Sequence, residues 1–216
     1  MAKGRTLWEM FTGLFDTPAE PGFFNPLRAK PGAGFTIDNV EWRDHNFRLD
    51  EIRDYRRHIR GQEFSFADYV LVDRPLHADE VRVRLRVNPV ADPAVAGVSQ
   101  HALLLHLEDD LAYSKELHDA VKSDTKSFQI HHDGGETEDF YRLNDVADSY
   151  KADEAVIRDG KEVQKLRLEY WDYSRDVPDA AGQPTTEYLF VEMDSDSGWF
   201  QLWRGVEVDP HKVVVM

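Results

Sequence analysis

Apolar and polar residues alternate most regularly between Glu80 and Asn88, where the sequence reads EVRVRLRVN. A period of two places successive side chains on opposite faces of a β-strand. One face would belong to an apolar core and carries Val81, Val83, Leu85 and Val87. The other carries Arg82, Arg84 and Arg86. We expect these arginines to form a solvated face paired with carboxylates of neighbouring strands, the alternative being an acidic partner or a phosphate.

Further strands are predicted on both sides of this segment. They span 35–43, 46–56, 63–73 and 80–88 in the first half, and 154–158, 161–173, 185–194 and 198–208 in the second. Asp159-Gly160 is the strongest turn signal, because both residues accept the positive φ of a type I′ turn. Between the halves, 101–108 reads as a strand buried on both faces. A short helix from the acidic residues 108–110 through Val121 and a hairpin of 126–132 with 138–143 should follow.

The two halves share a sequence pattern. Asp54-Tyr55, Gly61-Gln62 and Asp68-Tyr69 correspond to Asp172-Tyr173, Gly182-Gln183 and Glu187-Tyr188. This correspondence predicts an internal duplication of a four-strand unit. The expected fold class is mainly β: two related antiparallel β units packed together, with an amphipathic N-terminal helix and a short central helix. The predicted segments are a helix and Pro/Gly linker (1–34), the first unit (35–88), a connector (89–153) and the second unit (154–216).

The N-terminal segment carries an apolar stripe with helical spacing. Thr6 and Glu9 have the spacing of a capping box, so a helix should begin there. Five large apolar side chains then lie on one side of about two turns. They are Leu7, Trp8, Phe11, Leu14 and Phe15. Because so short a helix is marginal alone, it must dock either on its own domain or in the groove of a protein partner. A peripheral membrane contact is the weaker alternative, since only Lys3 and Arg5 are basic here.

Composition narrows the classes of function. The net charge of −15 argues against a nucleic-acid partner, because such binding needs clustered Lys and Arg to neutralise phosphates. No apolar run approaches the roughly 20 residues needed to span a bilayer, and the N-terminus lacks the features of a secretory signal. Cysteine is absent, which excludes disulfides and thiolate chemistry. The expected location is the cytoplasm.

The most metal-like cluster is His131, His132 and Asp133, because imidazole and carboxylate ligands suit zinc or divalent iron. Adjacent histidines on a strand point to opposite faces, so at most one would bind the metal with Asp133. A solvated hairpin tip is the alternative. The run 194–198 resembles a calcium loop, but Gly205 stands where the closing Glu is needed, so we expect a polar turn. No catalytic or cofactor motif is found, so the sequence predicts no cofactor and favours a protein that is not an enzyme.

The C-terminal part resembles a group of uncharacterised bacterial proteins with short β domains. The similar pieces are a Tyr-Trp-Asp-Tyr run at 170–173, a Glu-Tyr-Leu strand with its Val-Glu-Met-Asp turn at 187–194, and a Trp-containing strand at 199–203. Some members of that group look like companions of envelope-stress proteins, so the resemblance implies accessory work. We therefore expect a non-catalytic interaction module that binds a protein partner. The alternatives are an enzyme with an active site dispersed in the sequence and a metal or small-ligand sensor.

Overall fold

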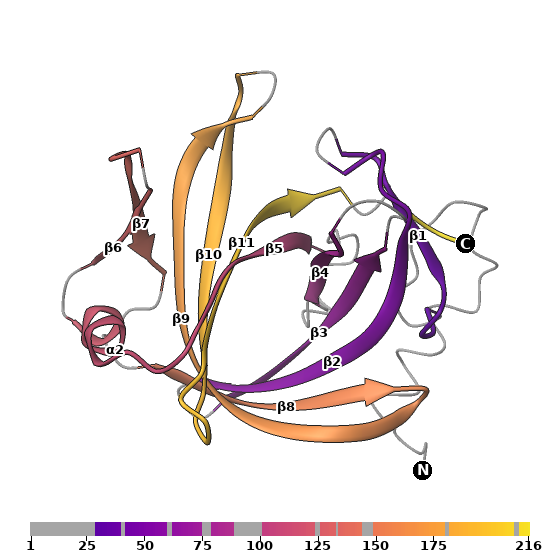
Figure 1. Ribbon diagram of the computed structural model, residues 1–216, viewed down its shortest axis with the longest axis horizontal. Helices are drawn as coiled ribbons and strands as arrows, with labels where there is room; N and C mark the ends of the chain where they lie inside the picture. Colours follow the sequence, from indigo (N-terminus) through magenta and orange to yellow (C-terminus); the bar gives the residue numbers. More distant parts are fainter. Residues whose placement is uncertain are drawn as a thin grey trace, which may run out of the picture.

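A computed structural model describes residues 29–39, 42–59, 62–74, 79–88, 101–123, 126–132, 134–143, 149–179, 182–209 and 212–216. The elements in these ranges are β1 (Gly34–Ile37), β2 (Phe47–Ile59), β3 (Gln62–Asp73), β4 (Val81–Asn88), β5 (His101–Leu111), α2 (Lys115–Lys122), β6 (Ser127–His131), β7 (Thr137–Arg142), β8 (Tyr150–Arg158), β9 (Lys161–Pro178), β10 (Pro184–Asp194), β11 (Phe200–Val208) and β12 (Val213–Val215) (Figure 1). The fold is therefore mainly β, as predicted.

Eight of these strands close into an antiparallel barrel. Their order is β2-β3-β4-β5-β11-β10-β9-β8, and β8 pairs with β2 to complete the ring. This closing pair, which we call the β2–β8 seam, joins residues 52–58 to residues 151–157. Outside the ring, β1 and β12 extend the sheet beyond β2, and β7 and β6 extend it beyond β9. A barrel of eight strands has an interior just wide enough to be filled by side chains.

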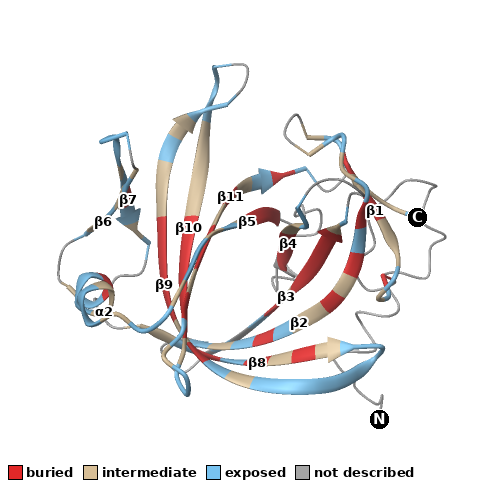
Figure 2. Ribbon diagram, viewed as in Figure 1, coloured by how far each residue is buried: buried red, intermediate tan, exposed pale blue. Residues whose placement is uncertain are grey.

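The outer face of the wall formed by β2 to β5 is a hydrophobic core. Val83 and Leu85 of β4 are fully buried there and share a cluster with Phe35 of β1 and Leu104 of β5. In Figure 2, buried stretches run along β3, β4 and the end of β5 beside β4, and others lie on β9 and β10. The predicted core face of residues 80–88 is confirmed. The predicted burial of both faces of 101–108 is confirmed for residues 102–105, because Leu104 lies in the outer cluster and Leu105 in a second cluster inside the barrel. It was wrong for Leu107, which is 36% exposed.

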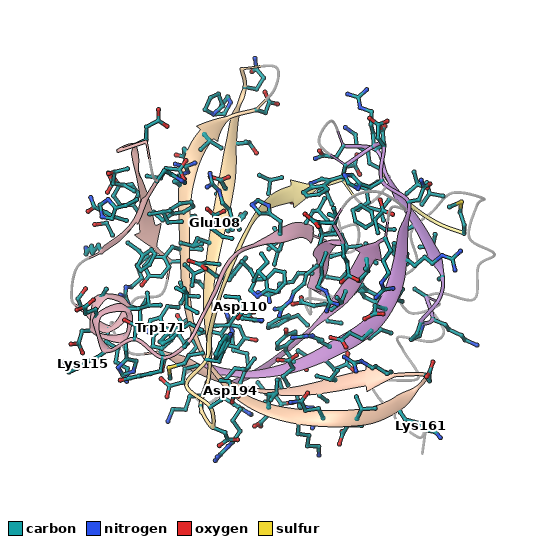
Figure 3. The ribbon with its side chains drawn as sticks, in the orientation of Figure 1. Glu108, Asp110, Lys115, Lys161, Trp171 and Asp194 are labelled. Atoms are coloured by element: carbon teal, nitrogen blue, oxygen red, sulfur yellow. The ribbon has the colours of Figure 1, made fainter. Side chains whose placement is uncertain are left out.

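A separate core covers the outer face of β9, β10 and β11. Val121 of α2 and Phe140 of β7 pack there with Trp171, Leu189 and Phe200. Trp171, labelled in Figure 3, lies on the side of β9 that faces α2. The helix and the β6–β7 hairpin are thus anchored to the barrel wall by apolar packing.

The short central helix exists, but it begins later than predicted. Its N-cap is Ser114, whose hydroxyl accepts a hydrogen bond from the backbone N–H of Leu117 at 3.2 Å. Asp109 and Asp110, expected at the helix start, belong to β5 and pair with β11. The prediction failed because Asp109 and Asp110 form backbone pairing with β11 as part of β5. At the start of a helix they would lose this pairing.

Within each predicted unit the strands pair in the expected order, β1 to β4 and β8 to β11, but β2–β4 and β8–β11 are parts of one barrel and β1 lies outside it. Their duplication is not shown. Tyr55 points into the barrel, whereas its predicted counterpart Tyr173 packs in the outer core. Asp68 is likewise internal, whereas Glu187 pairs with arginines on the outer face. The residues that correspond in sequence therefore lie on opposite faces of the wall.

The predicted N-terminal helix lies outside the described residues, so the stripe of Leu7, Trp8, Phe11, Leu14 and Phe15 stays a prediction. Within the residues that the structure describes, no helix is long and apolar enough to cross a membrane.

Candidate functional site

The arginine face of β4 points into the barrel. Arg84 and Arg86 are only 1% and 2% exposed, so the predicted solvated face was wrong for both. Arg82, at the start of the strand, keeps 37% of its side chain exposed. The cause is barrel closure: the apolar face of β4 is taken up by the outer core, so the opposite face must line the interior.

Two carboxylates hold the buried arginines. Asp68 of β3 accepts hydrogen bonds from Arg86 at 2.8 and 2.9 Å. Glu192 of β10 accepts one from Arg84 and one from Arg86, both at 2.7 Å. Because β4 and β10 are not neighbours in the ring, Glu192 ties opposite parts of the barrel together. The expected pairing with cross-strand carboxylates is confirmed for Asp68.

Electrostatic interactions within this cluster favour the charged forms of Arg86 and Asp68. Burial alone would lower the pKa of Arg86, but Asp68 and Glu192 reverse this and raise it well above its ordinary value. Burial would raise the pKa of Asp68, but Arg86 and Arg84 lower it below its ordinary value. Desolvating charges is costly unless each is paired and hydrogen-bonded, and this cluster meets that condition for both arginines.

A second internal ion pair joins β2 to β9. Arg57 donates to both carboxylate oxygens of Asp172, at 2.6 and 3.0 Å. Its guanidinium carbon lies 4.5 Å from the ring centre of Tyr170, within the range of a cation–π contact. This bidentate pair adds another link across the interior.

Aromatic rings fill the space between the charges. The guanidinium carbon of Arg84 lies 3.6 Å from the ring centre of Trp203, and that of Arg86 lies 4.5 Å from the ring centre of Phe66. Four polar atoms of this interior have no hydrogen-bond partner in the described structure. They are Arg57 Nε, Arg84 Nε, Glu154 Oε1 and Tyr170 Oη. Apart from these atoms, the guanidinium groups of Arg57, Arg84 and Arg86 donate to Asp68, Asp172 and Glu192. Arg84 also donates to Tyr55 and Gln201, so these cations stabilise the closed barrel.

An ion-pair network on the outer face clamps β7 to the wall. Glu138 of β7 accepts hydrogen bonds from Arg175 of β9 at 2.7 Å and from Arg204 of β11 at 2.8 Å. Both arginines also bond to Glu187 of β10. Burial alone would raise the pKa of Glu138, but hydrogen bonds from His132, Arg175 and Arg204 lower it to about 2. Glu108, labelled in Figure 3, lies 3.7 Å from Arg204 at the edge of this network.

The predicted metal ligands have other partners. His132 Nε2 lies 3.1 Å from Glu138, and His131 Nδ1 lies 3.1 Å from the hydroxyl of Thr137. Asp133 lies outside the described residues. Among the residues that the structure does describe, no group of three His, Cys, Asp or Glu side chains is placed to hold a metal ion. The metal site that includes Asp133 stays a prediction.

The expected polar turn at 194–198 is confirmed. The carboxylate of Asp194 accepts hydrogen bonds from the N–H of Asp196 at 3.0 Å and the hydroxyl of Ser197 at 2.6 Å. Gly198 closes the turn with φ +75°, a conformation that glycine adopts without steric cost.

Sequence reasoning missed the carboxylates that line the barrel. Asp68 interrupts the otherwise apolar run FADYVLV, and Glu192 interrupts YLFVEM. A charged residue in such a run is a signal that a buried partner exists. It does not identify the partner, and Arg86 is 106 residues away from Glu192. Comparison of this chain with protein-family models, curated proteins and solved structures found no match.

Proposed function

We propose that this protein is a non-catalytic accessory module that binds a protein partner through its N-terminal apolar stripe. One observation carries the proposal: the buried arginines of the barrel are paired with buried carboxylates of the same barrel. A binding or catalytic site needs polar groups whose hydrogen-bonding atoms remain available to a ligand. Here those groups stabilise the scaffold.

The packing of the interior supports the same proposal. A barrel of this size can hold one small ligand only where side chains leave room for it. In this chain, large aromatic rings occupy the interior together with the ion pairs. The buried ones are Tyr55, Phe66, Tyr170, Phe190 and Trp203. An accessory role is also what the resemblance of residues 170–203 to a group of uncharacterised bacterial proteins implies, because some members of that group look like companions of envelope-stress proteins. The cytoplasm remains the proposed compartment.

The partner-binding segment that we propose is the apolar stripe that includes Trp8 and Phe11. Docking five large apolar side chains would contribute several kcal/mol, at roughly 25 cal/mol per Å² of buried apolar area. If a partner provides the groove, Phe11→Asp should abolish recovery of that partner and leave the melting temperature unchanged. The measurement is affinity purification of the full-length tagged protein from its native host, together with thermal unfolding of each variant.

The matched control is Val163→Asp, which places the same charge on an apolar side chain that is 54% exposed on β9. This control should recover the partner as the unmodified chain does. The proposal fails if Phe11→Asp still recovers the partner. A lower melting temperature with unchanged recovery would instead assign the stripe to packing on its own body.

A further inference from the structure

Glu154 occupies an unusual position in the β2–β8 seam. It lies opposite Tyr55 in the strand ladder and is only 2% exposed. Its nearest cation is Arg53, whose Nη1 lies 3.2 Å from Oε1. The Nε of Arg53 donates to Glu51 at 2.7 Å, and Glu154 Oε1 has no hydrogen-bond partner among the described residues. The carboxyl group of Glu154 therefore lies close to Arg53, whose guanidinium group already donates to Glu51.

The groups around Glu154 compensate its charge only in part. Among the described residues, the charged and titratable groups that interact with it are Arg53 and Tyr55 of β2, Asp68 of β3, Arg84 of β4, Tyr170 of β9 and Glu192 of β10. Arg84 is committed to Glu192, and on β9 the residue opposite Glu154 is the uncharged Leu166. Two of the facing groups are carboxylates, so an ionised Glu154 would add a third negative charge to a buried space.

We propose that Glu154 makes the β2–β8 seam a pH-sensitive closure, firm while its carboxyl group is protonated and looser once that group ionises. The pairing of these two strands closes the ring of eight strands into the barrel. A buried carboxylate there, compensated only in part, is relieved when the seam opens and water reaches it. This device is independent of the proposed partner-binding role.

The direction of the effect follows from where the proton is held. Burial raises the pKa of Glu154 to about 7, from an ordinary value of 4.5, and the attraction of Arg53 and Arg84 offsets only part of this. Between pH 4.5 and pH 7, Glu154 is protonated while the seam is closed and ionised once the seam is open. The stabilisation is therefore complete below pH 4.5 and is lost as the pH rises through 7.

The test is hydrogen–deuterium exchange of the full-length protein at pH 6 and pH 8, corrected for intrinsic exchange rates. From the two pKa values, protection of the seam amides at 52–58 and 151–157 should fall about tenfold between these pH values. Amides of the β3–β4 pairing should keep their protection. Glu154→Gln keeps the shape of the neutral group and should remove the pH dependence at the seam.

Glu138→Gln is the matched control, because it removes a carboxyl group from the outer network and should leave the tenfold change intact. The proposal is overturned if Glu154→Gln loses protection as the unmodified chain does, or if β3–β4 loses it equally.

A direct titration does not depend on any variant. The carboxyl carbon of Glu154, followed by NMR, should titrate near pH 7, and a midpoint at or below 4.5 would overturn the proposal.

Discussion

Gly205→Ala should destabilise the barrel by more than about 3 kcal/mol, the upper end of the usual cost of overpacking. Gly205 of β11 pairs with Leu105 of β5 and with Tyr188 of β10. A Cβ atom there would lie 1.9 Å from the backbone oxygen of Leu104. Because that oxygen belongs to the main chain of the adjacent strand, relief of the overlap requires the β5–β11 ladder to separate. The measurement is denaturant unfolding followed by circular dichroism.

Gly134→Ala is the control for this substitution. A Cβ at Gly134 would meet no atom of the described residues within 4 Å, and this glycine does not have a positive φ. The control should therefore unfold at the same denaturant concentration as the unmodified chain, or slightly higher because alanine restricts the unfolded chain. Equal stability of the two variants would show that β5 and β11 do not approach each other as closely as described.

Glu192→Gln should cost about 3–5 kcal/mol, the usual result of removing one partner from a buried ion pair. The substitution keeps the shape of the side chain and removes the negative charge that Arg84 and Arg86 share. Both guanidinium groups are almost fully buried, so only Asp68 would remain to balance two positive charges. Equilibrium unfolding in urea gives the change in free energy.

A surface ion pair provides the comparison. Lys115 and Asp119 form an i,i+4 pair whose side chains are 79% and 60% exposed. Asp119→Asn should leave the unfolding midpoint unchanged, because exposed pairs are screened by water and salt. Wild-type stability of Glu192→Gln would mean that Arg84 and Arg86 are solvated, as the sequence pattern had suggested.

The strand pattern could be predicted from the sequence because it depends on local signals. Asp159-Gly160 marked the β8–β9 turn, and both residues have the positive φ that the turn type requires. The apolar run of β5 indicated burial on both faces, and the barrel places its residues in an inner and an outer cluster. These signals lie within a few residues of each other, so no knowledge of the tertiary fold was needed.

The interior of the barrel could not be predicted in the same way. Alternation in β4 separates Leu85 from Arg84 and Arg86, but it does not say which face closes inward. That choice depends on β1, β7 and α2, which cover the outer faces of the wall. The burial of the arginines and their pairing with Glu192 follow only from closure at the β2–β8 seam.

The most direct test of this account is a double-mutant cycle between Arg86 and Glu192. The variants Arg86→Met, Glu192→Gln and their combination are unfolded in urea under identical conditions. Arg86 Nη2 lies 2.7 Å from Glu192 Oε1 across the closed barrel, so the account predicts a coupling free energy of about 2 kcal/mol. Additive effects, with a coupling free energy near zero, would contradict a barrel closed around paired charges.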